Sequence, residues 1–456
     1  MSRDRDRTER LRRADKAHLW HPFTPMGEWV AGDPVIIESG EGEFLIDTEG
    51  NRYIDGVSSL WCNLHGHRRR ELDEAVRAQL DRIAHSTLLG LASPPSVELA
   101  ARLAGLAPKG LTRVFYSDSG ATAVEIALKM AFQYWRQCPK PRPEKTRFVH
   151  LQYGYHGDTI GAVSVGGIGL FHGLYRPLLF ESIQAPAPYC YRCPLGLRPE
   201  GCGMACAARM EEILESRGKE VAAVILEPLV QGAAGMIVHP EGYLRRVADA
   251  CRATGVLLIA DEVATGFGRT GRLFACEHEG IAPDLLCLAK GISGGYLPLA
   301  ATLATERIYE AFLGDPAENR TFFHGHTYTG NALACAAGLA SLDVFEKDRV
   351  LARITALAAG LGQRLAPLAD LEHVGEVRQR GLMVGIELVA DRESRRPFPA
   401  AEAAGAAACE AARKRGAWVR PLGDVVVLMP PYCISDESLA SLVDAVKQGI
   451  VEATEA

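Results

Sequence analysis

Two short apolar runs, each ending in a single charged side chain, constrain this chain more than any other feature of its sequence. Val256-Leu-Leu-Ile-Ala leads into Asp261, and Leu285-Leu-Cys-Leu-Ala leads into Lys290. Runs of this length bounded by polar residues are typical of buried strands in a parallel sheet. Ligands of open α/β sheets bind beyond the carboxyl ends of the strands. We therefore expect the lysine and the carboxylate to lie side by side at a ligand site.

Pyridoxal 5'-phosphate is a cofactor that requires this pairing of side chains. An amine forms a Schiff base with its aldehyde, and a carboxylate keeps its pyridine nitrogen protonated. A lysine at a strand end is, taken alone, more often an ordinary surface residue. The interpretation of Lys290 and Asp261 as a cofactor site therefore depends on the other motifs in the chain.

The order of the apolar patterns predicts the fold class and the domains. Strand-like and helix-like segments alternate from about residue 112 to 305, which predicts a large, doubly wound, mostly parallel α/β domain. An Ala/Leu-rich helical pattern and short strands follow, which predicts a smaller α+β domain. We expect an N-terminal segment (1–60) that packs with the small domain, a large domain (61–335) and the small domain itself (336–456).

Composition and charge exclude several classes of protein. The 456 residues carry a net charge of −6 with both signs mixed, which indicates neither a nucleic-acid groove nor binding to an anionic membrane. No apolar run approaches the ~20 residues that span a bilayer. The charged first residues lack the apolar stretch of a signal peptide, so we expect a cytoplasmic protein that acts on small molecules.

Two further motifs are suited to the phosphate and the ring of such a cofactor. Ser119, Gly120 and Ala121 follow a predicted strand and open a predicted helix, where backbone N–H groups and the positive helix end bind phosphate. Ser119 is a good helix cap, and a glycine allows close approach. Tyr155 follows the next strand and is expected to cover one face of the ring.

Together these motifs resemble a known family. The runs SDSGATAVEIALKMA, GYHGDT, ILEP, IADEVATGFGRTG, LAKG and HGHTYTGN look like those of the class III (ω-) aminotransferases. The resemblance implies the fold type I of pyridoxal-phosphate-dependent transferases and a homodimer with shared active sites. It implies Lys290 as the Schiff-base lysine, Asp261 at the pyridine nitrogen, and Tyr155 on the ring. It also implies a phosphate site formed by Ser119, Gly120, Ala121 and, from the other subunit, Thr327.

A second set of motifs resembles the branch of that family that works in biotin biosynthesis. These motifs are Leu-Trp-His-Pro-Phe23-Thr, Ser-Ser-Leu60-Trp61 and Trp-Val-Arg420-Pro-Leu-Gly. The resemblance implies conversion of 8-amino-7-oxononanoate to 7,8-diaminononanoate. It implies that Arg420 holds the substrate carboxylate, as a guanidinium fork can do with two bonds. Phe23, Leu60 and Trp61 are the other expected substrate-binding residues.

Three positions depart from the common pattern of that branch and leave the amino donor open. Phe23 and Val427 replace frequent tyrosines, and Leu60 replaces a frequent tryptophan. We expect all three to line the substrate pocket and to make it more apolar or roomier. The common enzyme uses S-adenosylmethionine as donor, whereas a second form uses lysine, and the run around His326 is more like the second form.

A cluster of four cysteines stands apart from the cofactor motifs. Cys190, Cys193, Cys202 and Cys206 lie within 17 residues flanked by turn-forming residues. Such pairs are suited to a structural zinc ion or an iron–sulfur cluster. Reduced free thiols or a redox-sensitive disulfide are the alternatives.

Three other functions remain open at this point. The first is another class III ω-aminotransferase, for a diamine, an ω-amino acid or acetylornithine. The second is an aminomutase of the same fold, which needs no separate donor. The third is a pyridoxal-binding scaffold without activity, against which the intact Lys290, Asp261 and Tyr155 argue.

Overall fold

A seven-stranded, mostly parallel sheet forms the centre of the larger part of the molecule in the computed structural model, which describes residues 2–455. Its strand order is β4-β12-β11-β10-β7-β5-β6. Only β12 runs antiparallel to its two neighbours. The strands are β4 (Leu111–Ser117), β5 (Arg147–Leu151), β6 (Ile183–Ala185), β7 (Val221–Leu226), β10 (Leu257–Asp261), β11 (Leu285–Leu288) and β12 (Ala300–Thr305).

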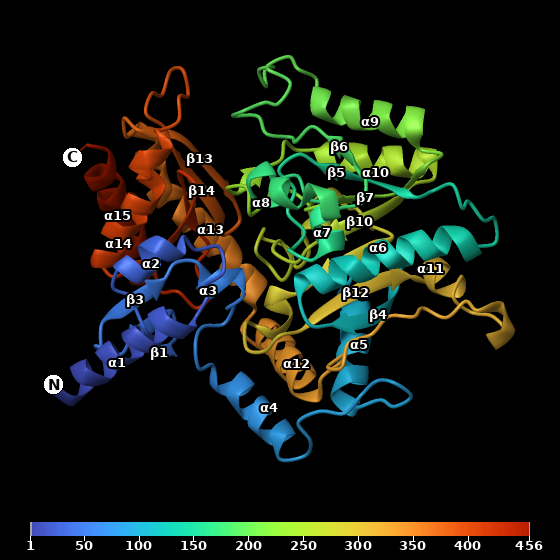
Figure 1. Ribbon diagram of the computed structural model, residues 1–456, viewed down its shortest axis with the longest axis horizontal. Helices are drawn as coiled ribbons and strands as arrows, with labels where there is room; N and C mark the ends of the chain where they lie inside the picture. The colour runs from blue at the N-terminus through green and yellow to red at the C-terminus, as the bar shows by residue number, and fades with distance from the viewer. Residues whose placement is uncertain (1, 456) are drawn as a thin grey trace.

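Helices cover both faces of this sheet. Alternate side chains of a strand point to opposite faces, so each strand packs against helices on both sides. Leu257 and Ile259 pack in one core cluster with α6 (Gly120–Gln137). Leu258 and Ala260 pack in another with α10 (Tyr243–Thr254), and α9 (Ala205–Arg217) lies beside α10. Figure 1 shows α6 and the α9–α10 pair around the sheet. The predicted doubly wound arrangement is present.

The N-terminal strands share a sheet with a C-terminal strand. β1 (Ile37–Glu41), β2 (Phe44–Asp47) and β3 (Arg52–Asp55) are joined by β15 (Ala417–Trp418), which runs parallel to β3. A third sheet contains β13 (Val374–Arg380), β14 (Met383–Leu388), β17 (Val425–Leu428) and β16 (Arg420–Leu422). In Figure 1 the blue N-terminal elements lie beside the red C-terminal ones. The domain boundaries at 60 and 335 stay predictions.

The remaining elements connect or cover these sheets. A small hairpin is formed by β8 (Val230–Gln231) and β9 (Ile237–Val238). The other helices are α1 (Ser2–His18), α2 (Met26–Ala31), α3 (Ser58–Trp61), α4 (Arg70–Leu80), α5 (Pro94–Leu106), α7 (Ile160–Ser164), α8 (Gly169–His172), α11 (Glu306–Glu310), α12 (Ala332–Lys347), α13 (Val350–Leu365), α14 (Ala404–Lys414) and α15 (Asp436–Thr454). The short 3-10 helices of the described residues are η1 (Gly173–Leu178), η2 (Ala275–Glu279), η3 (Lys290–Ser293), η4 (Pro316–Glu318), η5 (Ala366–Asp370) and η6 (Ala400–Glu402). Across residues 2–455, none of the helices has the length and apolar character needed to cross a bilayer.

Candidate active site

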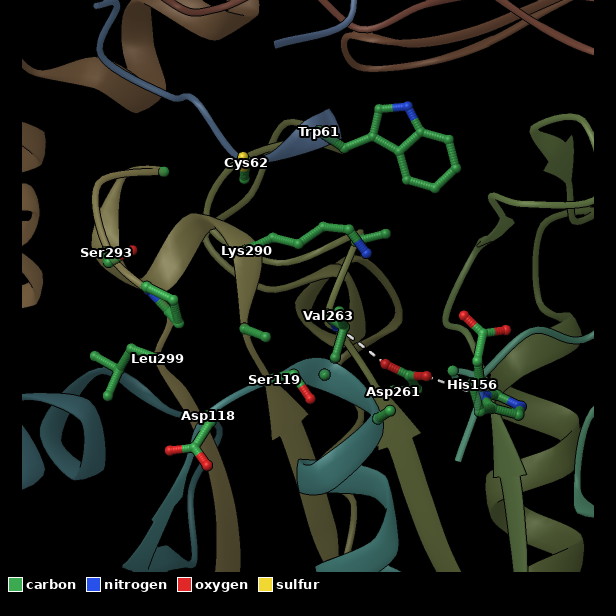
Figure 2. A pocket seen from close by; sticks show the side chains of 18 of the residues that line it. Trp61, Cys62, Asp118, Ser119, His156, Asp261, Val263, Lys290, Ser293 and Leu299 are labelled. Atoms are coloured by element: carbon green, nitrogen blue, oxygen red, sulfur yellow. Dashed lines mark hydrogen bonds and ion pairs between the residues drawn. The ribbon is translucent and has the colours of Figure 1, made fainter. Parts of the chain in front are cut away.

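Asp261 and Lys290 line the same cavity, at the carboxyl ends of two neighbouring strands. Asp261 is the last residue of β10, where it pairs with Cys287 of β11, and Lys290 follows the end of β11 by two residues. The cavity has a volume of about 700 Å³, in the range typical of small-molecule sites. Figure 2 shows Lys290 extending across it above Asp261. Adjacent parallel strands therefore bring the amine and the carboxylate together.

The amine of Lys290 lies in a setting that favours its neutral form. Burial lowers the pKa of Lys290, while the nearby carboxylates of Asp261 and Glu227 act in the opposite direction. The amine nitrogen lies 5.4 Å from the centre of the Trp61 ring. Trp61 stands above the lysine in Figure 2. A lysine with a lowered pKa in a cavity is suited to act as a nucleophile or a base.

Asp261 is held by two hydrogen bonds that leave it facing the cavity. Its Oδ1 accepts the backbone N–H of Val263 at 3.0 Å, and its Oδ2 lies 2.7 Å from Nδ1 of His156. Both bonds are drawn in Figure 2. Because a carboxylate only accepts, His156 carries its proton on Nδ1. His156 and Asp261 are both buried, so the ring fixes the orientation of the carboxylate.

The start of α6 forms one wall of the cavity. Ser119 is the helix cap, and its side chain accepts the N–H of Thr122 at 3.4 Å. The N–H groups of Gly120 and Ala121 precede the first bonded turn and have no partner within the helix. A Cβ at Gly120 would lie 2.6 Å from a methyl carbon of Val263. The glycine is therefore needed for packing against the turn that follows β10, as well as for access to the N–H groups.

Tyr155 is fixed at both its backbone and its side chain. Its N–H donates to Oε1 of Glu227 at 3.1 Å, and its hydroxyl donates to Oδ2 of Asp158 at 2.7 Å. Burial and this hydroxyl contact raise the pKa of Tyr155, so the phenol stays protonated. Glu227 is itself buried and also accepts the N–H of Gly232 at 2.8 Å. Burial raises the pKa of Glu227 to about 7.

Trp61 is placed by a strained turn. Ser58, Ser59 and Trp61 all have positive φ, of 50°, 61° and 65°. Such conformations persist only where the surroundings enforce them. Asp55 accepts both the backbone N–H and the hydroxyl of Ser59, at 2.7 and 2.9 Å, and Ser58 donates its hydroxyl to the carbonyl of Met429 at 2.7 Å. Contacts outside α3 thus hold the indole in the cavity.

The other expected substrate-binding residues lie away from the cavity lining. Phe23 is 55% exposed, and its ring contacts Phe171, which in turn contacts Tyr155. Leu60 is half exposed, and Arg420 is partly buried in β16. Among the residues that the structure describes, the cavity lining includes Trp61 but none of these three. Their roles as substrate contacts stay predictions.

Val427 does not line the pocket as expected. It is fully buried in β17, where it pairs with Gly385 of β14 and with Arg420 of β16. Val427 shares a sheet face with Arg420, its direct partner in the antiparallel pair, but its side chain is completely covered and cannot line a cavity. The change from tyrosine at this position therefore alters core packing.

Thr327 lies outside the cavity of its own chain. It is exposed, and its carbonyl accepts a hydrogen bond from Nε2 of His85 at 2.9 Å. Phe323 and Tyr328, in the same segment, are 77% and 60% exposed. This position is compatible with the expectation that Thr327 acts at another subunit.

The four clustered cysteines gather around a second cavity of about 350 Å³. None of them forms a disulfide. Burial raises the pKa of Cys190, and it raises that of Cys206 to about 11, whereas metals bind the thiolate. Within residues 2–455, no group of three or more His, Cys, Asp or Glu side chains could hold a metal ion. The prediction of zinc or an iron–sulfur cluster here is not supported.

Several cavity residues received no role from the sequence. His156 and Asp158 stand in the same Tyr-His-Gly-Asp run as Tyr155. The sequence therefore indicated their place in the chain but not their hydrogen-bond partners. Asp118 precedes the helix cap Ser119. The apolar residues 297–299 also line the cavity, and they follow Lys290 in a loop without a recognisable pattern.

Comparison with known proteins identifies close relatives. The class-III aminotransferase family matches residues 27–450. The adenosylmethionine-8-amino-7-oxononanoate aminotransferase of Nitratidesulfovibrio vulgaris is 61% identical over 98% of this chain and 83% of its own. The crystal structure of the enzyme of that name from Methanocaldococcus jannaschii is 48% identical, with a TM-score of 0.92 over 97% of this chain and 99% of its own. An (S)-enantioselective ω-transaminase from Thermomicrobium roseum is 39% identical, with a TM-score of 0.93 over 98% of both chains.

Proposed function

The chain belongs to the class-III aminotransferase family, and from this premise we propose that it makes 7,8-diaminononanoate by transferring an amino group to 8-amino-7-oxononanoate. This is the reaction of biotin biosynthesis that the names of its relatives describe. The observation that carries the proposal is one cavity in which Lys290, Asp261 and the start of α6 meet. The predicted fold, type I of the pyridoxal-phosphate-dependent transferases, is confirmed by the matching solved structures.

The residues of this cavity fit pyridoxal phosphate. Lys290 offers an amine with a lowered pKa, and Asp261 offers a carboxylate whose other contacts are already satisfied. The free N–H groups of Gly120 and Ala121, next to the hydroxyl of Ser119, suit a phosphate at a helix start. Tyr155 and Val263 line the space between these groups and suit the two faces of a ring.

When bound, the cofactor would supply an electron sink that stabilises negative charge on the carbon next to the transferred nitrogen. Asp261 would keep a positive charge on the ring nitrogen, and His156 would hold Asp261 in place. Lys290 Nζ would take a proton from the donor carbon in the first half of the reaction. It would give a proton to the acceptor carbon in the second half. Trp61 would shield the amine from water on the upper side of the cavity.

The charge of the cavity suits cationic substrates. Asp118, Asp158, Asp261 and Glu227 all line it, and the acidic side chains outnumber Lys290. The acceptor carries an ammonium group at its position 8, and both donors under consideration are cations. We propose that Asp158, whose Oδ2 accepts the Tyr155 hydroxyl, contacts such a group through its remaining oxygen. Phe23, Leu60 and Arg420 complete the substrate site in this proposal.

We propose S-adenosylmethionine as the amino donor, because the names of the relatives contain it. Lysine is the alternative, and a comparison of the two donors tests the function as a whole. Each donor is added alone to the purified yellow enzyme, and the absorbance of the bound cofactor is followed. A change with S-adenosylmethionine, reversed by 8-amino-7-oxononanoate, is expected. A response to simple chiral amines alone would instead place the chain with ω-transaminases such as that of Thermomicrobium roseum.

We propose that the enzyme acts as a homodimer in which Thr327 reaches the phosphate in the partner's cavity. Large apolar side chains are exposed in two places near Thr327. Some are close to it along the chain, and the others are in the segment around His85, which hydrogen-bonds to Thr327. They are Leu80, Ile83, Leu89, Leu91, Phe323 and Tyr328. Exposed apolar surface of this kind marks a site of protein association.

Mixed dimers test the shared site. A Lys290→Ala subunit lacks the amine, and a Thr327→Ala subunit lacks the phosphate contact that it lends to its partner. In a mixed dimer one cavity carries both defects and the other carries neither. Activity is therefore expected to rise when the two weak homodimers are dissociated, mixed and reassembled. A mixture no more active than the Thr327→Ala homodimer would show that Thr327 acts within its own chain.

A further inference from the structure

One face of α6 holds the segment that carries Thr327. Lys129, Gln133 and Gln137 lie four residues apart and therefore share a helix face. Their side-chain nitrogens donate to backbone carbonyl oxygens within residues 320–323, at 3.1 to 3.3 Å. The segment thus runs along α6 toward the helix start, where the phosphate is proposed to bind.

At this end of the segment, two histidines join α6 to the residue before its cap. Nζ of Lys129 lies 3.0 Å from Nδ1 of His324. Nε2 of His324 lies 3.3 Å from Nε2 of His326. Nδ1 of His326 lies 2.7 Å from Oδ2 of Asp118. Four side chains therefore form one continuous series of hydrogen bonds, here called the histidine relay.

The chemistry of the two end groups fixes every proton in the histidine relay. An ammonium only donates and a carboxylate only accepts. Nδ1 of His324 must therefore accept from Lys129, which puts the proton of that ring on Nε2. This proton is donated to Nε2 of His326, whose own proton lies on Nδ1 and points to Asp118. In this arrangement each ring uses a single tautomer.

The charged groups around the rings support this assignment. Burial, Lys129 and His326 lower the pKa of His324, and Glu125 acts in the opposite direction. An additional proton on His324 would face the ammonium of Lys129. On His326 it would face the N–H of His324, and either contact would break the relay.

The ends of the relay lie next to two proposed phosphate contacts. Asp118 lines the cavity and precedes Ser119, while His326 precedes Thr327. We propose that His324 and His326 are positioning residues, which fix the Ser119 loop and the Thr327 segment relative to each other. Each chain would then set parts of two phosphate sites, its own and its partner's. This inference rests on the proposed cofactor and dimer.

Binding of the cofactor with and without its phosphate tests the relay. Dissociation constants of pyridoxal phosphate and of pyridoxal are measured on the full-length apoenzyme. His326→Ala is expected to weaken binding of pyridoxal phosphate about tenfold, the effect of one lost hydrogen bond to a charged group. Binding of pyridoxal should change less than about twofold, since it lacks the phosphate. His326→Asn, whose amide nitrogen can replace Nδ1 toward Asp118, should recover most of the loss.

Controls separate this role from general damage. His373 is also partly buried and bonds a carbonyl through Nδ1, but it lies beside β14, away from the cavity, so His373→Ala should leave both constants unchanged. Equal weakening of both ligands by His326→Ala, or no weakening of either, would overturn the relay. A wild-type enzyme that binds no pyridoxal phosphate would instead refute the proposed function.

Discussion

Nδ1 of His156 lies 2.7 Å from Oδ2 of Asp261, and neither side chain has appreciable contact with solvent. The two residues come from different strand ends, since His156 follows β5 and Asp261 closes β10. The second nitrogen of His156 is buried and has no hydrogen-bond partner within the described part of the chain. The ring is therefore fixed by one bond, and that bond orients the carboxylate proposed to face the pyridine nitrogen.

Removal of the His156 ring should reduce turnover more than it reduces cofactor binding. In His156→Ala the carboxylate of Asp261 loses one of its two fixed contacts, and a misplaced catalytic group costs on the order of 10–100-fold in rate. His156→Asn keeps a donor near the position of Nδ1 and should recover part of the rate. The checks are kcat and the dissociation constant of pyridoxal phosphate for both variants. Unchanged kcat in His156→Ala would show that Asp261 needs no support.

Lys290→Ala should abolish turnover while the protein still binds pyridoxal phosphate. The side chain is the only amine among the described residues that line the cavity, so neither the covalent attachment nor the proton transfer has a substitute. Borohydride treatment followed by mass spectrometry should label the Lys290 peptide in the wild type alone. Normal turnover in the variant, or a label on another lysine, would contradict the assignment.

The sequence assigns Arg420 to substrate binding, but Arg420 is not among the described residues that line the cavity. Arg420→Ala tests this assignment. If the guanidinium binds the carboxylate of 8-amino-7-oxononanoate in two bonds, the variant should raise KM for that substrate by roughly 10–1,000-fold. KM for the amino donor should stay near its wild-type value. Arg420→Lys should recover little, because an ammonium lacks the two-bonded geometry. Equal changes in both KM values would point to a structural role in β16.

The sequence predicted the centre of the large sheet well because its strands are fully buried. The runs before Asp261 and Lys290 are apolar at every position, and they form β10 and β11 with a register that aligns the two strand ends. The helix that Ser119, Gly120 and Ala121 were expected to open is α6, with Ser119 as its cap. Local patterns of burial and capping were sufficient for these features.

The remaining parts of the site depend on contacts that no local pattern encodes. His156 meets Asp261 across 105 residues. Arg269 is buried with no carboxylate partner among residues 2–455, and it donates to the carbonyls of Trp61, Asn63 and Pro430. Such bonds join turns from three distant segments. The expected place of Val427 in the pocket was wrong for a similar reason, since packing between distant segments covers its side chain completely.

Glu262 should make the protein less stable as the pH rises toward neutrality. Burial raises its pKa from 4.5 to about 7, although its carboxylate accepts the N–H groups of Ala275 and Cys276. Between these values the native state retains a proton that the unfolded chain has lost. The stabilisation is therefore complete below pH 4.5 and is lost as the pH rises through 7.

The Glu262→Gln variant isolates this contribution, because glutamine does not titrate. Thermal unfolding midpoints of the apoprotein are compared at pH 5 and pH 8. Over this interval the free energy of unfolding should fall by about 1–3 kcal/mol more in the wild type than in the variant, and the midpoint should fall accordingly. Parallel pH profiles for the two proteins would show that Glu262 is ionised in the native state throughout.

Gly157→Ala should damage the phosphate end of the cavity. Gly157 has a φ of 116°, and a Cβ there would lie 2.3 Å from the Cβ of Ala121, at the start of α6. Backbone strain and overlap of this kind together cost about 2–5 kcal/mol. Since the overlap displaces an N–H group proposed to bind phosphate, affinity for pyridoxal phosphate should fall together with thermal stability.

Gly173→Ala is the matched control, because a Cβ at Gly173 meets no atom within 4 Å and its φ of −58° suits any residue. Its effect on stability should stay within about 0.5–1 kcal/mol. Pyridoxal, which lacks the phosphate, should bind Gly157→Ala with a smaller loss than pyridoxal phosphate does. If both ligands lose affinity equally, the overlap is relieved by movement of the Tyr155 turn rather than of α6, and the phosphate lies away from Ala121.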